Sequence, residues 1–130
     1  MHQQLIFAYL VHDDDPLLRL TIVMTLEKAG YQVVPAKEGV EALAILARDP
    51  AITLALSDIN MPGMDGPTFL SKAKEGYPSL PVIMLSVNSV WSWEPQMHAS
   101  GAQGYLPKPF TTQELLRSIQ SALGKEIMGN

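Results

Sequence analysis

The stretch "LIFAYLVHDDDPLLR", residues 5–19, runs from an unbroken apolar segment through three consecutive carboxylates to a proline suited to the first position of a helix. The run Leu5–Val11 lacks polar alternation, which is typical of a strand buried on both faces of a parallel sheet. Adjacent aspartates repel one another, and burying even one is costly. The stretch therefore predicts a strand–turn–helix unit in which Asp13–Asp15 either form a solvated turn or face a positive charge.

The same order of apolar run and helical period recurs along the 130 residues. Strands are predicted at Leu5–Val11, Gln32–Pro35, Ile52–Ser57, Pro81–Ser86 and Gly104–Leu106. Helices are predicted at Asp15–Ala29, Glu38–Arg48, Pro67–Glu75, weakly near Trp93–Ser100, and at Thr112–Leu123. Parallel strands covered by helices on both faces are the expected result, so we predict a single α/β domain over residues 1–130.

Two helices have clear signals at their ends. In the first, Asp15 is the expected cap, Pro16 the first residue and Gly30 the exit, with an inward face of Leu18, Ile22, Leu26 and Ala29. In the last, Thr111 or Thr112 is the expected cap, Glu114 lies in the first turn and Gly124 is the exit. Its inward residues are Leu115, Leu116, Ile119 and Leu123.

Composition narrows the class of protein. The net charge of −4 argues against direct binding to nucleic acid, which needs a basic face. The absence of cysteine excludes disulfides and thiol catalysis. No apolar run approaches the roughly 20 residues that span a bilayer, and the N-terminus lacks the pattern of a signal peptide. A cytoplasmic location without membrane contact is the expectation.

The most informative residues are those that follow each strand, because parallel strands bring their carboxyl ends to one edge, where ligands of α/β sheets bind. Asp14 and Asp58 are carboxylates from two separate strands. Side by side they need a counter-charge, and Mg²⁺ with oxygen ligands is the usual choice beside a phosphoryl group. A lone aspartate at a strand end more often caps a turn, and both interpretations stay open for Asp58 taken alone.

A lysine and a serine complete this group. Lys108 stands between two prolines in "GYLPKPF", a rigid frame that suits an anion-binding ammonium, although a surface lysine is the commoner case. The hydroxyl of Ser86, at the end of "PVIMLS", either bonds to the backbone or reaches a phosphoryl oxygen. A Ser-His-Asp hydrolase is rejected, since no G-x-S-x-G turn surrounds this serine.

Four motifs in this order resemble the receiver domain of two-component response regulators, the CheY-like family. They are "HDDDPLLR", "DINMPGMDG", "IMLS" and "GYLPKPFT", and the likeness spans nearly the whole chain. The resemblance implies a flavodoxin-like, doubly wound five-stranded sheet of order 2-1-3-4-5 with five helices. It also implies a phosphorelay protein that accepts a phosphoryl group from a sensor histidine kinase or a histidine phosphotransfer protein.

Residue by residue, the resemblance makes Asp58 the phosphoacceptor and assigns the Mg²⁺ site to Asp13, Asp14, Asp58 and the backbone carbonyl of Asn60. It makes Lys108 the phosphate-binding lysine, Ser86 the switch hydroxyl and Tyr105 the aromatic that turns inward on activation. Such a protein is a switch that catalyses its own phosphorylation and dephosphorylation and is otherwise no enzyme. It signals through the face of the fourth helix, fifth strand and fifth helix, to an output domain, a partner or a second copy.

Some residues depart from the family pattern. His12 replaces a small apolar residue, and Val87 stands where Ala or Gly is common. Pro95 interrupts the fourth helix, which we therefore expect to be short or irregular. Trp91 and Trp93 either fill the core or anchor a partner.

Two other functions are weighed against the switch. The first is an interaction module that works without phosphorylation. The second is a phosphatase with an aspartate nucleophile, suggested by Asp13-x-Asp15, although Pro16 fits a helix start better. The chain is expected to be either a stand-alone receiver or a piece of a longer regulator or hybrid kinase.

Overall fold

Five parallel strands form one sheet in the order β2-β1-β3-β4-β5. The strands are β1 (Ala8–His12), β2 (Gln32–Ala36), β3 (Ile52–Asp58), β4 (Val82–Ser86) and β5 (Gly104–Pro107). The protein is represented by a computed structural model that describes residues 8–12, 16–49, 51–58, 66–86, 101–107 and 110–123. From β1 the chain first adds β2 on one side and then β3, β4 and β5 on the other, so the strand order reverses between β1 and β3. Ligands of such sheets bind in the crevice at this point of reversal.

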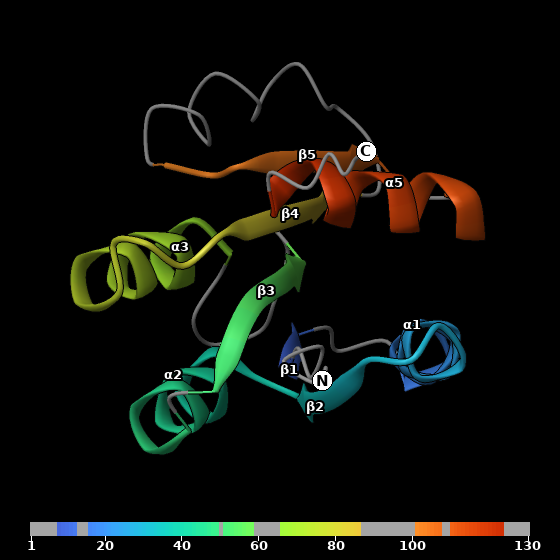
Figure 1. Cartoon of the computed structure of the whole chain (residues 1–130). Coiled ribbons are helices and arrows are strands. Elements are labelled where there is room, and N and C mark those ends of the chain that lie inside the picture. Colours follow the sequence, from blue (N-terminus) through green and yellow to red (C-terminus); the bar gives the residue numbers. More distant parts are fainter. Residues whose placement is uncertain are drawn as a thin grey trace, which may run out of the picture.

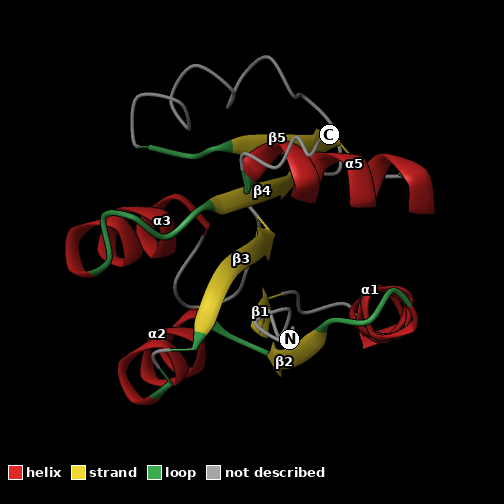
Figure 2. Cartoon of the chain, in the orientation of Figure 1, coloured by secondary structure: helices red, strands yellow, loops and turns green. Residues whose placement is uncertain are grey.

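Helices cover both faces of the sheet (Figures 1 and 2). α2 (Gly39–Arg48) and α3 (Gly66–Gly76) pack on one face, and α1 (Pro16–Lys28) and α5 (Thr112–Ala122) pack on the other. This layering confirms the predicted α/β class. It also explains why the strands are apolar without interruption, because a strand covered on both sides has no face for water. The predicted short or irregular fourth helix falls on residues 93–100, outside the described residues.

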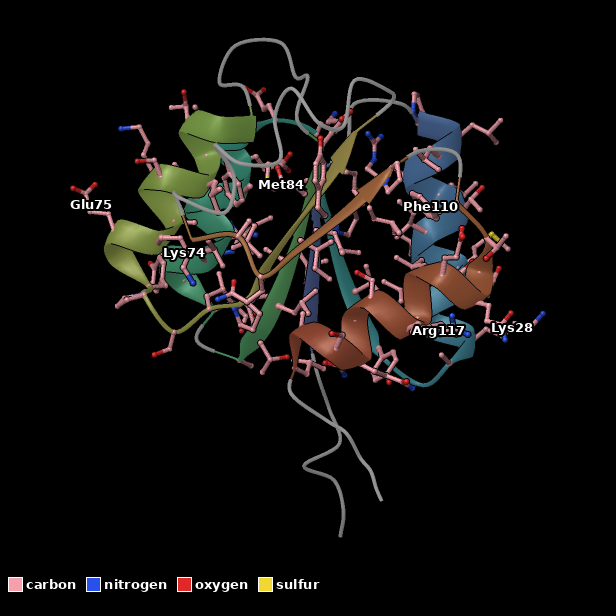
Figure 3. The ribbon with its side chains drawn as sticks, turned by 90° about the horizontal axis from the view of Figure 1, so that it is seen from above. Lys28, Lys74, Glu75, Met84, Phe110 and Arg117 are labelled. Atoms are coloured by element: carbon pink, nitrogen blue, oxygen red, sulfur yellow. The ribbon has the colours of Figure 1, made fainter. Side chains whose placement is uncertain are left out.

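The core consists of two layers, one on each face of the sheet. Successive residues of a strand point to opposite faces, so Val82 and Met84 of β4 join the layer under α2 and α3. Ile83 and Leu85 join the layer under α1 and α5. Met84 lies in the middle of the molecule in Figure 3 and is completely buried.

The ends of α1 are set by local sequence. The helix begins at Pro16, as expected. It ends before Gly30, which has φ +99°, a conformation that glycine adopts without the cost of a Cβ. Ile22 and Leu26 are buried as predicted. The prediction for Ala29 was wrong: α1 stops at Lys28, and Ala29 lies in the following turn, exposed to solvent.

The beginning of α5 is a capping box. The Thr111 side chain accepts a hydrogen bond from the Glu114 N–H at 3.0 Å, and the Glu114 carboxylate accepts one from the Thr111 N–H at 2.9 Å. Of the two candidate caps, Thr111 is the one that serves. Leu115 and Ile119 face inward and are buried, while Leu116 and Leu123 are half-buried against the same layer. None of the described helices is long and apolar enough to cross a membrane.

Candidate functional site

The carboxyl ends of the strands meet at one edge of the sheet, and the strand register places their last residues. His12 of β1 is paired with Ser57 of β3. Asp58, the last residue of β3, is paired with Leu85 of β4. Ser86, the last residue of β4, is paired with Pro107 of β5. The predicted gathering of residues at this edge is therefore anchored by four strands whose ends lie within two residues of one another in the register.

Asp58 is a buried carboxylate at the centre of this edge. Only 4% of its surface is exposed, and Ser57 beside it is fully buried. The Ser57 hydroxyl donates a hydrogen bond to the main-chain carbonyl of Asp58 at 3.1 Å, which holds the end of the strand. A charge taken out of water is expensive unless it is compensated. In the part of the chain that the structure describes, the buried polar side chains are Ser57 and Asp58, so Asp58 is the one buried charged residue there.

Of the other predicted site residues, the structure describes some and not others. Ser86 is placed by its backbone at the end of β4. Asp13, Asp14, Asn60 and Lys108 lie outside the described residues, as do Val87, Pro95, Trp91 and Trp93. Their roles stay predictions. The chain connects two of them directly to described ends, since Asp13 follows His12 and Lys108 follows Pro107, and Asp14 comes one residue after Asp13.

The donor chemistry at this edge suits a hard divalent cation. Within the described residues, His, Asp and Glu side chains form no group of three that could hold a metal. Asp58 supplies one buried carboxylate there. The remaining predicted donors are also oxygens, two carboxylates and a carbonyl, which Mg²⁺ prefers to nitrogen or sulfur.

Tyr105 of β5 is half-buried and packs against the core layer that lies under α2 and α3. Its hydroxyl oxygen is shielded from solvent and has no hydrogen-bond partner in the structure as described. A buried hydroxyl without a partner costs about 1–3 kcal/mol. The ring is therefore held by apolar packing, and no polar group of the described residues bonds to its hydroxyl.

An apolar strip on the outer face of α1 was missed by the sequence reasoning. Leu17, Leu20 and Met24 are 74%, 54% and 60% exposed. Their spacings of three and four residues place them on one face of the helix. The same spacing rule that identified the inward face was the available signal, but it was applied to one face only. α1 begins just after Asp13–Asp15, so this strip starts at the edge that carries Asp58.

Comparisons of the sequence and of the fold with known proteins agree on the family of this chain. The model of the response regulator receiver domain matches residues 9–120. The DNA-binding transcriptional regulator NtrC of Salmonella typhimurium is 38% identical over 113 residues, which cover 87% of this chain and 24% of that protein. The sensor kinase CckA of Brucella abortus is 32% identical over 118 residues, covering 90% of this chain and 12% of that protein.

The fold agrees with a solved receiver. The chemotaxis response regulator CheY4 of Vibrio cholerae superposes with a TM-score of 0.83 at 34% identity, covering 91% of this chain and 99% of that one. The chain thus spans nearly all of a CheY protein but only about a quarter of NtrC. Fold, buried aspartate and motifs all agree with the family match: this chain belongs to the response regulator receiver domains, the CheY-like receivers of two-component systems.

Proposed function

We propose that the chain is a single receiver unit that accepts a phosphoryl group on Asp58 and changes the state of a signalling face in response. The observation that carries this proposal is the burial of Asp58, 4% exposed, at the end of the sheet's middle strand in a chain of the receiver family. The donor is a phosphohistidine, on a sensor histidine kinase or a histidine phosphotransfer protein. The protein acts in the cytoplasm.

The transfer is a displacement at phosphorus. One carboxylate oxygen of Asp58 attacks the phosphorus of the phosphohistidine, and the P–O bond forms as the P–N bond breaks. The imidazole nitrogen leaves with the electron pair of the broken bond. Hydrolysis later reverses the modification: water attacks the phosphorus, and the carboxylate of Asp58 leaves as inorganic phosphate is released. The protein contributes mainly position and charge to both steps.

Charge is the difficulty that the site has to overcome. His12 pairs with Ser57, and consecutive Cα atoms lie about 3.8 Å apart, so we expect the next two residues, Asp13 and Asp14, near the level of Asp58. Three carboxylates repel one another and would repel an incoming phosphoryl group. Asp13, Asp14, Asp58 and the Asn60 carbonyl would hold Mg²⁺, which would supply the positive charge that stabilises the phosphoryl oxygens.

Lys108 adds a second cation to the same edge. It follows Pro107, whose strand partner is Ser86, so we expect the lysine to lie near the switch serine. The ammonium binds the phosphoryl group as a point charge. The serine hydroxyl donates a hydrogen bond to a phosphoryl oxygen once Asp58 is modified.

The outer strip of α1 (Leu17, Leu20 and Met24) supports a docking site for the phosphoryl donor. An exposed apolar helix face next to the site suits a partner that presents helices of its own. Docking here holds the donor's phosphohistidine at the edge that contains Asp58. The sensor kinases among the relatives are in keeping with such a partner.

The signalling face is formed by α5 and by β5, which is the outer strand on the side of the sheet away from β2 (Figure 1). Phosphorylation pulls Ser86 toward the phosphoryl group, and Tyr105, whose hydroxyl is unbonded in the described structure, turns further inward. The change shifts an equilibrium between two arrangements of this face. The face then contacts an output domain, a partner protein or a second copy of the chain.

A small phosphodonor tests the central step. Incubation of the wild-type protein with acetyl phosphate and Mg²⁺ is expected to add the mass of one phosphoryl group, read by mass spectrometry of the intact protein. Asp58→Asn is expected to gain nothing. The matched variant Asp49→Asn changes an aspartate at the other end of β3 and is expected to react like the wild type. Unmodified wild type, or a phosphorylated Asp58→Asn, would refute the proposal and favour a module that works without phosphorylation.

A further inference from the structure

A cavity of about 570 Å³ lies at the edge of the sheet opposite to Asp58. Its walls are the last turn of α2, the turn after α3 that leads into β4, and the first residues of β3. Asp58 is six residues further along β3 than Ile52, about 20 Å at the rise of a strand. The cavity is thus separate from the phosphorylation site, and its size falls within the range of pockets for small organic ligands.

The walls are mostly apolar and are held by hydrogen bonds. Leu46, Ile52 and Leu80 line it and are otherwise buried, and the ring of Tyr77 is 37% exposed at its wall. The turn after α3 is fixed by two backbone hydrogen bonds: the Tyr77 N–H donates to Ala73 O at 2.7 Å, and the Leu80 N–H donates to Tyr77 O at 3.0 Å. A wall of this kind keeps its shape without a ligand.

Asp49 is the single charged side chain among the residues that line the cavity. Its Oδ1 accepts a hydrogen bond from the Ala51 N–H at 3.1 Å, and Oδ2 has no partner in the part of the chain that is described. The nearby ammonium of Lys74 is already bound to the Leu80 carbonyl at 2.7 Å and does not line the cavity. A ligand therefore meets one open carboxylate oxygen among apolar walls.

We propose that this cavity binds small organic cations that combine one ammonium group with an apolar body about the size of an aromatic ring. The ammonium donates to Oδ2 of Asp49, and the body packs against Leu46, Leu80 and the ring of Tyr77. The net negative charge of the whole chain, −4, also favours a cationic ligand.

Titration of the wild-type chain with 2-phenylethylamine, followed by amide NMR shifts, tests the proposal. Saturable shifts are expected at the amides of Asp49, Ile52, Tyr77 and Leu80. The uncharged analogue 2-phenylethanol, which keeps the ring, is expected to bind about tenfold more weakly because it loses a charge-assisted hydrogen bond. No saturable shifts at these amides, or equal dissociation constants for the amine and the alcohol, would overturn it.

Two variants locate the charge. Asp49→Asn keeps an oxygen for the Ala51 N–H and is expected to raise the dissociation constant of the amine about tenfold. Glu75→Gln removes the same charge from the outer side of α3, where Glu75 points away from the sheet (Figure 3), and is expected to leave binding unchanged. Equal binding by the two variants contradicts the assignment. Should Asp49→Asn fail to fold, the comparison of amine and alcohol on the wild type decides alone.

Discussion

Asp58 of β3 lies in register with Leu85 of β4, one residue before Ser86, the last residue of that strand. A group added to the carboxylate of Asp58 is therefore added where β4 ends, beside the residue predicted to sense it. Because Asp58 is buried, its charge also affects the stability of the fold, and that effect can be measured without any partner.

Replacing Asp58 by Asn is expected to raise the free energy of unfolding in Mg²⁺-free buffer by about 1 kcal/mol, because it removes one of the three carboxylates that repel one another at the proposed site. Mg²⁺ at ten times its dissociation constant is expected to stabilise the wild type by about 1.4 kcal/mol, since it binds the folded state only. Asp58→Asn is expected to lose most of this gain. Urea unfolding with and without Mg²⁺ measures both effects. An equal Mg²⁺ effect on both proteins would place the metal elsewhere.

Substitution of Leu20 by Glu is expected to slow phosphotransfer from a histidine kinase that phosphorylates the wild type by about tenfold or more, because it puts a charge in an apolar contact. Phosphorylation by acetyl phosphate is expected to stay unchanged, since that donor needs no docking surface. Time courses with radiolabelled kinase measure the first rate. Val40→Glu makes the same change on α2, at a side chain that is 63% exposed, and serves as the control. Equal slowing by the two variants would remove α1 from the docking site.

Thr111→Ala is expected to lower the free energy of unfolding by about 1 kcal/mol, because it breaks the capping box that begins α5. Chemical denaturation measures the loss. Thr112→Ala, one residue further on, leaves the cap in place and is expected to cost less than half as much. Modification of Asp58 by acetyl phosphate is expected to proceed normally in both. A normal stability for Thr111→Ala would mean that the first turn of α5 is held by packing alone.

Lys74 predicts a specific dependence on pH. Burial lowers the pKa of Lys74 below 10.5, because the neutral amine is easier to desolvate than the ammonium. Between the lowered value and 10.5 the unfolded chain binds more protons than the folded one, so the contribution of Lys74 to stability rises as pH increases through that window. Lys74→Met lacks this contribution. The difference in free energy of unfolding, wild type minus variant, is therefore expected to grow from neutral pH toward 10.5. A difference that stays constant or shrinks would contradict it.

Local signals in the sequence predicted most of the elements. The exit of α1 at Gly30 and its start at Pro16 depend on atoms within one turn of the chain, so neighbouring residues suffice to foresee them. The cap of α5 was narrowed to Thr111 or Thr112, and the structure selects Thr111. The ends of the strands were predicted less accurately. β1 and β3 each extend one residue beyond the predicted end, to His12 and Asp58, because pairing with a neighbour continues a strand past its apolar run.

Which apolar side chains are buried depends on how the helices pack against the sheet. Ala29 has the right spacing for the inner face of α1 but lies past the end of the helix, in the turn, and is exposed. Leu17, Leu20 and Met24 are as apolar as Ile22 and Leu26, yet only the latter two meet the sheet. Hydrophobicity indicates that a side chain gains by leaving water, and the neighbouring elements decide whether it does.

By itself, then, the sequence determined the alternation of strands and helices, the exit of α1, the cap of α5 and the residue types that follow each strand. These depend on short-range geometry and on the chemistry of single side chains. Only the tertiary structure decided that Asp58 is buried among the ends of paired strands, that one face of α1 stays open, and that a cavity forms beside Asp49. Each of these depends on contacts between segments far apart in the chain, and no local pattern of residues contains that information.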